Sequence, residues 1–500
     1  MLEKYYEEIK QNINVRENLS LIRGAIKNQE GLAHFLQLAG DGKVLTDLLA
    51  SEDAKTRKNA ALLLGDMELA DAAGALWSAY EGEQTLFVKS AYLTALGKIG
   101  AEEYLDAYRA RLAVLTAMDA AENEKKHIGE EIRALEKNIV ALCGATEHTF
   151  VGWKEAHKIL LTTNHEQREA TLSEIDELPA TVRRRESLHP LGVQVETPEL
   201  RPFTRLRTYR ELLFFVDTDG RLTGTPAQMA AAVWKSDFAD QVRACHKEDA
   251  PFYFRLEIKG RMEQDEKGEF ARRFCREFEQ LSGRTFLNST SDYEVEIRLV
   301  QTKDGSFVPF YKLSTLKIKR FAYRKNAIAT SIHPATAAML MQIAKPYLKE
   351  HAQILDPFCG VGTMLIERDI RVPAREKYGI DIFGDAIRMA RENAAAAGEQ
   401  IHFINRDYFD FKHDYLFDEI VTNMPVRGRK TKEEMDAFYA KFFRKSKEIL
   451  RDGAVVILYS NEEGFIKKQL RLTKEYRLLA EHCIRSKEHF YLYIIQYQGQ

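Results

Sequence analysis

The chain has 500 residues, and its 73 basic side chains are balanced by 75 acidic ones, so any nucleic-acid-binding surface must be local. Five cysteines without a C-x-x-C spacing argue against a disulfide framework and against a metal cage, and we expect no metal site. No stretch approaches the ~18 apolar residues of a membrane span, and the start lacks a signal peptide. The sequence therefore predicts a cytoplasmic protein of roughly three domains.

Residues 1–148 are expected to be entirely helical and weakly repetitive. Five positions recur in kind after 32 residues: Arg57, Ala60, Ala61, Leu64 and Gly65 are followed by Lys89, Tyr92, Leu93, Leu96 and Gly97. The pattern resembles HEAT-like repeats, in which helix pairs stack into one short solenoid. An irregular helical bundle with closely packed alanines is the alternative. Either arrangement predicts a packing or binding module, which could hold a protein partner.

From residue 149 to 325 the pattern changes to strands alternating with helices. It divides into two α+β units, at 149–235 and 236–325, and neither contains a candidate catalytic cluster. The expected strands cover 158–164, 192–197 and 211–217 in the first unit and 252–260 and 291–300 in the second, with helices at 165–178 and 269–283.

A basic stretch free of acidic residues lies between Gly305 and Lys349. Four aromatic residues are interleaved with its first six cations, so the stretch could contact phosphates and stack on unpaired bases. The alternative is a half-buried strand whose aromatics face the core. The aromatics are Phe310, Tyr311, Phe321 and Tyr323, and the candidate RNA-binding residues are Lys312, Lys317, Lys319, Arg320, Tyr323, Arg324 and Lys325. A weaker cluster, Arg201, Arg205, Arg207 and Arg210, could equally be a solvated face.

From residue 326 to the end, strands and helices alternate. The last two strands are separated only by the short segment RSKEH, so they form a hairpin. The sequence predicts a doubly wound, mostly parallel sheet with an antiparallel last strand. The expected strands cover 353–358, 377–382, 401–407, 419–424, 454–460, 477–484 and 490–498, and the helices cover 362–370, 384–398, 432–453 and 462–470.

The segment ILDPFCGVGTMLIE, residues 354–367, predicts a buried strand, a glycine-containing turn and the start of a helix. Gly360 and Gly362 carry no Cβ that would keep a ligand from the backbone. A phosphate-binding loop would need a lysine after the second glycine, and a dinucleotide fingerprint would need a third glycine where Leu365 stands. The turn, preceded by Asp356, suits a ligand with a positive charge.

Polar residues end three successive strands of the predicted sheet. Asp381 lies about 20 residues beyond the glycine turn, where a carboxylate can accept the hydroxyls of a ribose. Asp407 ends the next strand and can accept an exocyclic adenine amine, and Asn423 ends the one after it. Taken singly each is a common turn residue, but together they predict one site at the carboxyl edge of the sheet.

Four segments, DPFCGVGT, GIDI, NRDYFD and TNMP, resemble in order and spacing motifs I to IV of S-adenosylmethionine-dependent methyltransferases. The stretch KIKRFAYRKNAIATSIHPATAAML before them is similar to the THUMP-linked RNA methyltransferases that modify guanine N2 in tRNA or ribosomal RNA. This resemblance implies a multidomain α/β protein. It implies a ferredoxin-like unit at 149–235, a THUMP-like RNA-binding unit at 236–325 and a Rossmann-like methyltransferase domain at 326–500. The HEAT-like helical domain expected at 1–148 is not part of that family's usual pattern.

The resemblance also implies S-adenosylmethionine as the cofactor. Gly360 and Gly362 would approach its methionine moiety, and Asp381 would hold its ribose. His333 would lie in the segment that covers the cofactor, with a structural capping role as the alternative. The full set of implied cofactor residues is His333, Pro334, Asp356, Phe358, Gly360, Gly362, Thr363, Asp381, Ile382, Asp407, Tyr408 and Asn423.

The TNMPV segment is expected to carry the catalytic residues Asn423, Met424 and Pro425. The Asn423 amide oxygen and a backbone carbonyl of the following turn would accept the two hydrogens of a base amine and aim its lone pair at the methyl group. The segment contains no cysteine, which argues against methylation of pyrimidine C5. Val426 replaces the usual aromatic residue, so the identity of the methylated base stays open. Arg427, Arg429 and Lys430 could hold a phosphate of the RNA, or an arginine guanidinium could stack on the base.

We therefore expect an RNA methyltransferase that acts on guanine N2, in tRNA before ribosomal RNA. One alternative is a methyltransferase of proteins or small molecules that grips its partner with the helical repeats. The other is a non-enzymatic RNA-binding protein whose fourth motif has degenerated.

Overall fold

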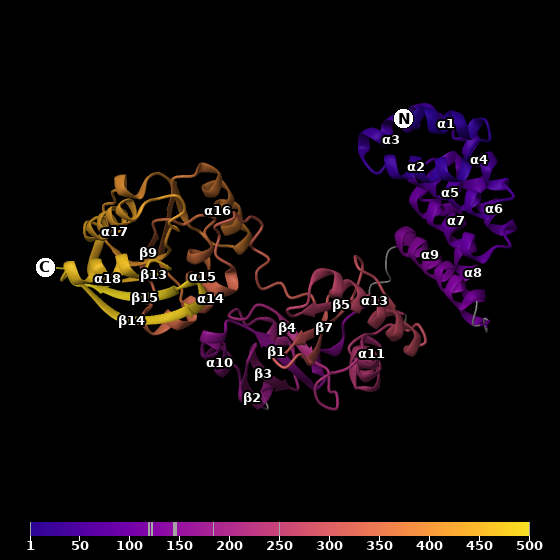
Figure 1. The fold of residues 1–500 in the computed structure, drawn as a ribbon. Coiled ribbons are helices and arrows are strands. Elements are labelled where there is room, and N and C mark those ends of the chain that lie inside the picture. The colour runs from indigo at the N-terminus through magenta and orange to yellow at the C-terminus, as the bar shows by residue number, and fades with distance from the viewer. Residues whose placement is uncertain are drawn as a thin grey trace. The chain divides into compact units, whose positions relative to one another are not determined.

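The computed structural model describes residues 2–118, 121, 124–143, 148–183, 185–249 and 251–499. The chain forms two compact units, Met1–Thr146 and Glu147–Gln500, which are shown by colour in Figure 1. Within the described ranges, none of the helices is long and apolar enough to cross a membrane.

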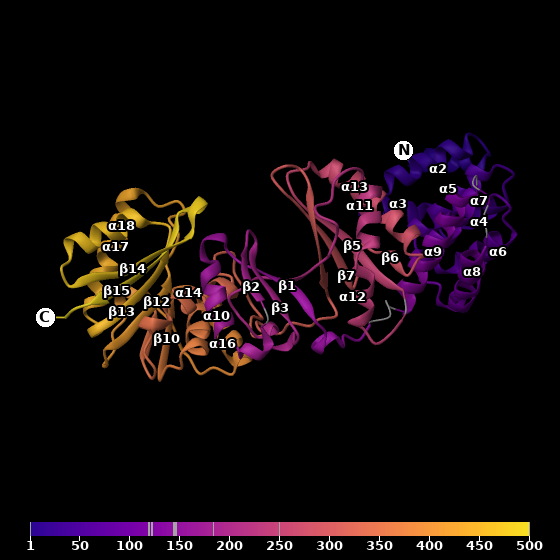
Figure 2. The ribbon, with the colours of Figure 1, turned by 90° about the horizontal axis from the view of Figure 1, so that it is seen from below.

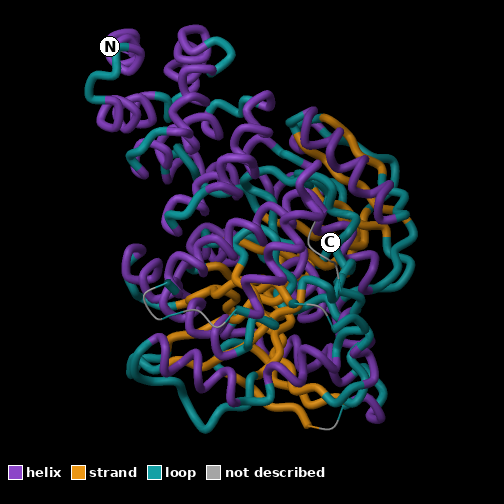
Figure 3. The backbone as a smooth tube through the Cα atoms, turned by 90° about the vertical axis from the view of Figure 1, so that its right-hand side faces the viewer, coloured by secondary structure: helices purple, strands orange, loops and turns teal. Residues whose placement is uncertain are grey.

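Every regular element described between residues 2 and 143 is helical (Figure 3). Helix α5 packs on α7, and α7 packs on α9. The repeated glycines lie at these contacts: a Cβ on Gly65 would lie 2.5 Å from the Ala95 Cα, and one on Gly97 would collide with the Asn138 amide. The repeat therefore marks close helix packing, and its HEAT-like identity stays a prediction. The helices are α1 (Leu2–Lys10), α2 (Val15–Ala25), α3 (Gln29–Ala39), α4 (Lys43–Asp47), α5 (Ala54–Asp66), α6 (Ala73–Gly82), α7 (Leu86–Ile99), α8 (Leu105–Ala117) and α9 (Lys125–Cys143).

An eight-stranded sheet with the order β2-β3-β1-β4-β8-β7-β5-β6 occupies the first half of the second unit (Figure 2). Strand β4 pairs with β8, where Phe214 faces Tyr311. The two predicted α+β units thus share one sheet, and the boundary at 235/236 stays a prediction. The strands are β1 (His157–Thr162), β2 (Arg185–His189), β3 (Gly192–Thr197), β4 (Leu212–Phe215), β5 (Phe252–Lys259), β6 (Phe286–Asn288), β7 (Val295–Gln301) and β8 (Phe307–Leu313), and the helices are α10 (Arg168–Asp176), α11 (Pro226–Lys235), α12 (Phe238–Ala244) and α13 (Gln264–Leu281).

The C-terminal part is a seven-stranded sheet with the order β11-β10-β9-β12-β13-β15-β14. Strands β11 to β13 are parallel, and β15 lies antiparallel between β13 and β14, which confirms the predicted doubly wound sheet with a reversed last strand. The strands are β9 (Gln353–Asp356), β10 (Glu376–Asp381), β11 (His402–Asn405), β12 (Phe417–Asn423), β13 (Leu450–Ser460), β14 (Tyr476–Arg485) and β15 (Phe490–Tyr497).

Helices cover both faces of this sheet. Side chains of α17 and α18 pack on one face, and those of α14, α15 and α16 pack on the other. The helix expected at 432–453 ends at Lys447, because the chain enters β13 at Leu450. The helices are α14 (Pro334–Ala344), α15 (Thr363–Arg371), α16 (Gly384–Ala397), α17 (Lys432–Lys447) and α18 (Glu463–Leu472).

Candidate active site

The glycine turn between β9 and α15 forms the floor of the site. Gly360 and Gly362 have φ angles of +51° and +83°, a left-handed conformation that glycine adopts without strain. No atom lies within 4 Å of a Cβ built on Gly360, so its open side faces empty space. A Cβ on Gly362 would instead lie 2.9 Å from the Phe403 ring. Gly360 thus provides the cradle, whereas Gly362 permits close packing behind it.

A cavity of about 530 Å³ lies over this turn at the carboxyl ends of β9, β10 and β12, a volume typical of small-molecule sites. Eleven of the predicted cofactor and catalytic residues line it: Asp356, Phe358, Gly360, Thr363, Asp381, Ile382, Asp407, Tyr408, Asn423, Met424 and Pro425.

Two carboxylates are fixed at the mouth of the cavity by backbone N–H groups. Asp381 accepts hydrogen bonds from the Gly360 and Phe383 amides, both at 2.9 Å. Asp407 accepts one from the Phe409 amide at 2.9 Å and caps a short 3₁₀ turn. Each carboxylate oxygen retains a lone pair, so both groups can also accept hydrogen bonds from a ligand.

Buried polar atoms of the cavity wall need a partner. One Asp356 oxygen accepts from the Phe358 amide at 3.0 Å and from the Thr422 hydroxyl at 2.6 Å. The other Asp356 oxygen and the Thr363 hydroxyl are buried without a hydrogen-bond partner among the described residues. Burial raises the pKa of Asp356 to about 7. A ligand that brings a cation or hydrogen-bond donors would satisfy both groups.

The turn after β12 carries the candidate catalytic residues. The Met424 amide donates to the Tyr459 carbonyl at 2.9 Å, which continues the strand pairing past Asn423. Asn423 is half-buried, and its side chain makes no hydrogen bond to another residue of the described chain. Its amide is therefore available to a substrate in the cavity. Val426 is 48% exposed beside it.

Another part of the cavity wall comes from the segment just before α14, whose residues were not predicted individually. Ile328, Thr330, Ser331 and Ile332 line the cavity, immediately before the predicted His333 and Pro334. They belong to the stretch KIKRFAYRKNAIATSIHPATAAML, whose family resemblance implied that a segment near His333 covers the cofactor, but it did not single them out.

His333 and Pro334 are not in the cavity wall. The His333 Nδ1 accepts from the Ala335 amide at 3.2 Å and caps α14, which confirms the capping alternative. Pro334 is buried in the first turn of that helix. Phe383 and Phe438 line the cavity without having been predicted, and Lys430, a candidate phosphate contact, also lines it.

The basic stretch is largely used inside the protein. Phe310 and Tyr311 are fully buried, and Tyr323 is 5% exposed with its hydroxyl donating to Glu367 at 2.6 Å. These rings offer no free face to a base, which corrects the prediction that Tyr323 stacks on RNA. The reason is that β8 and the following segment need aromatic residues for the core.

Arg320 also has a structural role. Its guanidinium donates to the Leu206 and Arg210 carbonyls, both at 2.8 Å, and lies 3.5 Å from the Tyr209 ring centroid. Arg324 donates to the Ile332 carbonyl at 3.3 Å. These contacts tie the two arginines to the backbone rather than to a ligand.

A basic groove remains beside this segment. Its volume is about 590 Å³, and Arg210, Lys312, Lys317 and Lys319 are among the residues that line it. Lys312 is paired with Glu211 at 2.9 Å. Loss of hydration and then the charges of Arg210, Arg324 and Arg320 lower the pKa of His333 to about 4, as expected of a positive field. Lys325, Arg427 and Arg429 lie outside the groove lining.

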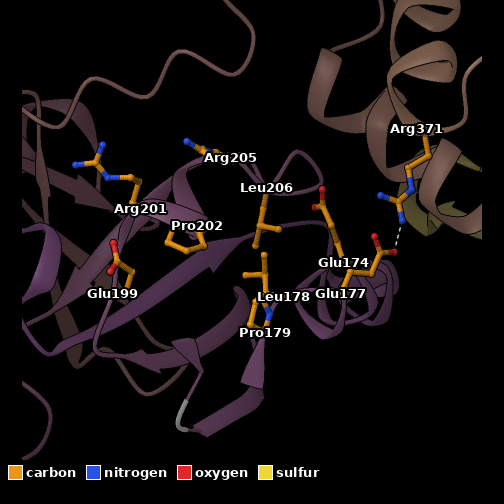
Figure 4. Close-up of a pocket in the computed structure, with 10 residues that line it drawn as sticks. All are labelled: Glu174, Glu177, Leu178, Pro179, Glu199, Arg201, Pro202, Arg205, Leu206 and Arg371. Atoms are coloured by element: carbon orange, nitrogen blue, oxygen red, sulfur yellow. Dashed lines mark hydrogen bonds and ion pairs between the residues drawn. The ribbon is translucent and has the colours of Figure 1, made fainter. Parts of the chain in front are cut away.

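The weaker arginine cluster is divided between surfaces. Arg201 and Arg205 line a separate cavity of about 470 Å³, where Arg371 is paired with Glu177 (Figure 4). Arg207 points inward and forms two hydrogen bonds of 2.8 Å with the buried Glu367. The cluster therefore is not one solvated face.

Comparison with known families identifies the C-terminal part. A methyltransferase family, UPF0020, described as an RMKL-like methyltransferase domain, matches residues 322–477. The tRNA (guanine(10)-N2)-dimethyltransferase of Methanothermobacter thermautotrophicus is 26% identical over 155 residues, which cover 30% of this chain and 45% of that protein. An uncharacterised protein of Mycoplasma genitalium is 30% identical over 117 residues, 23% of this chain and 25% of its own. The chain thus spans less than half the length of the curated relatives it matches.

Solved structures share the fold over a longer range. TrmN from Thermus thermophilus has a TM-score of 0.51 and 20% identity, covering 68% of this chain and 99% of its own. A putative methyltransferase crystallised with S-adenosylhomocysteine has a TM-score of 0.51 and 15% identity. The match covers 69% of this chain and 99% of that protein. Residues 322–477 therefore form a methyltransferase domain.

Proposed function

We propose that this S-adenosylmethionine-dependent methyltransferase domain methylates an exocyclic amine of an RNA base, with guanine N2 in tRNA as the first candidate and ribosomal RNA as the second. The observation that carries the proposal is the available Asn423 amide beside the cofactor cradle. The relative named as a tRNA guanine-N2 dimethyltransferase supports the choice of base and RNA.

The cavity residues fit the cofactor. Gly360 leaves room for the methionine moiety of the cofactor to approach the backbone. The unsatisfied oxygen of Asp356 suits the positively charged amine of the cofactor. Asp381 would accept the ribose hydroxyls, and Asp407 the adenine amine. When bound, S-adenosylmethionine supplies an electrophilic methyl group on a sulfonium.

Asn423 and the turn after it would prepare the acceptor. A base amine is a weak nucleophile because its lone pair is delocalised into the ring. The Asn423 Oδ1 and a carbonyl of the Met424–Pro425 turn would accept its two hydrogens and hold the lone pair in line with the methyl group. Asn423 and the turn carbonyl would hold the amine in this orientation, and the proton that the methylated amine gives up would pass to water. The protein would contribute mainly by positioning the amine, because the sulfonium already carries the positive charge and the transfer creates no new one.

The basic groove would contact the RNA backbone through Lys317 and Lys319, whose charges attract phosphates in a salt-dependent way. Arg427 and Arg429 follow the catalytic turn and would hold a phosphate near the target base. Arg427 donates to the Lys430 carbonyl at 2.9 Å, which folds this loop back on itself. The target base must leave its stack to enter the cavity.

Methyl transfer from labelled S-adenosylmethionine to separated tRNA, ribosomal RNA and protein fractions tests the proposal. We expect label in tRNA, and nucleoside mass spectrometry should identify N2-methylguanosine. Label confined to protein or small molecules would replace the proposal with the first alternative. Cofactor binding without any transfer would favour the degenerate RNA-binding protein, a possibility raised by Val426 in place of an aromatic residue.

Asn423→Ala tests the catalytic assignment. Because it removes the amide that orients the acceptor, we expect transfer to fall at least ~100-fold, while the affinity for S-adenosylhomocysteine stays within twofold. Asn423→Asp retains an acceptor oxygen and should lose less activity. If Asn423→Ala keeps wild-type transfer, Asn423 has no catalytic role.

A further inference from the structure

One part of the cavity wall belongs to a segment without regular secondary structure, residues 326–332, here called the strap. It leads from the basic stretch to the start of α14. Four of its seven residues, Ile328, Thr330, Ser331 and Ile332, line the cofactor cavity. The shape of the cavity therefore depends on what holds this irregular segment in place.

Asn393 on α16 makes the central attachment of the strap. Its side chain is fully buried. The amide oxygen accepts from the Asn326 backbone N–H at 2.9 Å, and the amide nitrogen donates to the Asn326 carbonyl at 3.1 Å. The same nitrogen donates to the Val361 carbonyl at 3.1 Å. One side chain thus joins α16, the strap and the middle of the glycine turn.

The other attachments of the strap are weaker or lie at its ends. The Asn326 side chain donates to the exposed Glu392 at 2.6 Å. A local turn is closed between Ile328 and Ser331 by bonds of 2.9 and 3.0 Å. Beyond the strap, Tyr323 is held by Glu367 on one side, and His333 caps α14 on the other. Near its C-terminal end the strap is also held by Arg324, which donates to the Ile332 carbonyl at 3.3 Å, and by the packing of Ile332 on the core. Without Asn393, the N-terminal half of the strap would have only the exposed Glu392 contact to hold it against α16.

We propose that Asn393 is a positioning residue for cofactor binding: it holds the strap against the glycine turn so that the cavity keeps its fourth wall. Asn393 does not line the cavity, so it acts through the strap and through Val361. A released strap must be ordered again whenever the cofactor binds, and that ordering lowers the apparent affinity. The inference concerns the cofactor, so it holds whichever acceptor is methylated.

Asn393→Ala removes all three bonds and leaves three backbone groups without this partner. We expect the affinity for S-adenosylhomocysteine, measured by isothermal titration calorimetry on the full chain, to fall about tenfold or more. The KM for S-adenosylmethionine should rise while kcat at saturating cofactor changes less. Asn393→Asp keeps the acceptor oxygen but turns a carboxylate oxygen toward two carbonyls, so it should bind at least as weakly.

Two controls separate this role from a general loss of stability. Glu392→Ala removes the exposed bond to the strap together with an exposed ion pair to Arg388, and it should bind within twofold of the wild type. Asn138→Ala removes another buried asparagine, which donates to the Leu93 carbonyl in the helical unit. It should lower thermal stability without changing cofactor affinity.

Trypsin provides a readout that does not depend on the cofactor. Arg324 and Lys325 lie directly before the strap, so its release should speed cleavage after them in Asn393→Ala and not in Glu392→Ala. If Asn393→Ala folds poorly and only Asn393→Asp can be purified, the same cleavage rate is measured on Asn393→Asp.

The proposal is overturned if Asn393→Ala, or Asn393→Asp in its place, binds S-adenosylhomocysteine within twofold of Glu392→Ala. It is equally overturned if the only change is a lower Tm. If the wild-type protein binds the cofactor but methylates no RNA, that result counts against the proposed function alone, and the role of Asn393 is still decided by the binding of its variants.

Discussion

Asp356 combines a buried position with an unsatisfied oxygen at the floor of the cofactor cavity. Its raised pKa means that the carboxyl is protonated over part of the physiological range. The charged form suits a cationic ligand, while the neutral form suits the empty cavity. Cofactor binding and ionisation of Asp356 should therefore be linked.

We predict that the affinity for S-adenosylhomocysteine falls as the pH decreases through about 7. Asp356→Asn should flatten this dependence and weaken binding at pH 8 by about 10 to 100-fold, the range of a hydrogen bond to a charged group. Isothermal titration calorimetry between pH 5.5 and 8.5 measures both effects. A pH-independent affinity in the wild type would contradict the linkage.

The raised pKa of Asp356 also determines how this residue changes the stability of the fold with pH. Since the folded pKa lies above the unfolded value of 3.8, the contribution of Asp356 to stability is fully present below about pH 4 and is lost as the pH rises through about 7. At pH 8 the cofactor-free Asp356→Asn protein should therefore have a Tm equal to or above that of the wild type.

At the residue scale, the sequence predicted the cavity better than its surroundings. Strand-end residues such as Asp381 and Asn423 were found because parallel strands present their carboxyl ends at one edge. Tyr323 and Arg320 were misassigned because composition cannot distinguish an exposed aromatic and basic surface from a buried stack of the same residues. Asn393 gave no signal, since its partners are backbone groups distant in the chain.

The start of α15 shows how one element builds the site. Gly362 precedes the helix in a left-handed conformation, and a Cβ there would press on Phe403 of β11. Arg368, further along α15, forms a fully buried ion pair with Glu419 of β12 at 2.7 Å. The helix thus holds the glycine turn beside the strand that ends in Asn423.

Gly362→Ala should therefore damage both stability and cofactor binding. The left-handed conformation costs about 1–2 kcal/mol for alanine, and the contact with Phe403 shifts the turn. Gly398→Ala is the matched control, because Gly398 has a φ of +74° and no atom within 4 Å of its built Cβ. Both variants should lower the Tm, and only Gly362→Ala should weaken S-adenosylhomocysteine binding. If Gly362→Ala and Gly398→Ala bind S-adenosylhomocysteine equally well, the glycine turn tolerates a Cβ at residue 362.

At the element scale, amphipathic and alternating segments were predicted well, whereas several short elements were not. Strand β3 matches its expected range, residue for residue. Helix α11 was missed although Thr225 and Gln228 form a capping box before it, a signal that can be read from sequence. Strand β8 was treated as a possible RNA surface because its pairing with β4, almost a hundred residues away, cannot be seen locally.

At the scale of the whole molecule, the two compact units differ in charge. Residues 1–146 contain 17 basic and 23 acidic residues, so the helical unit is acidic and the remainder of the chain carries the basic excess. A net negative unit is repelled by a phosphate backbone. This favours a protein partner over RNA for the helical unit, in line with the sequence-based expectation.

We predict that removing residues 1–146 leaves methyl transfer chemistry intact. The second unit contains the cofactor cavity, the basic groove and the strap, so affinity for S-adenosylhomocysteine should stay within twofold of the full chain. Binding to tRNA, measured by filter retention at two salt concentrations, should be equal or tighter, because the removed charge is net negative. A loss of RNA affinity of tenfold or more would instead assign the helical unit a direct role in holding the RNA, through cationic side chains that its overall charge conceals.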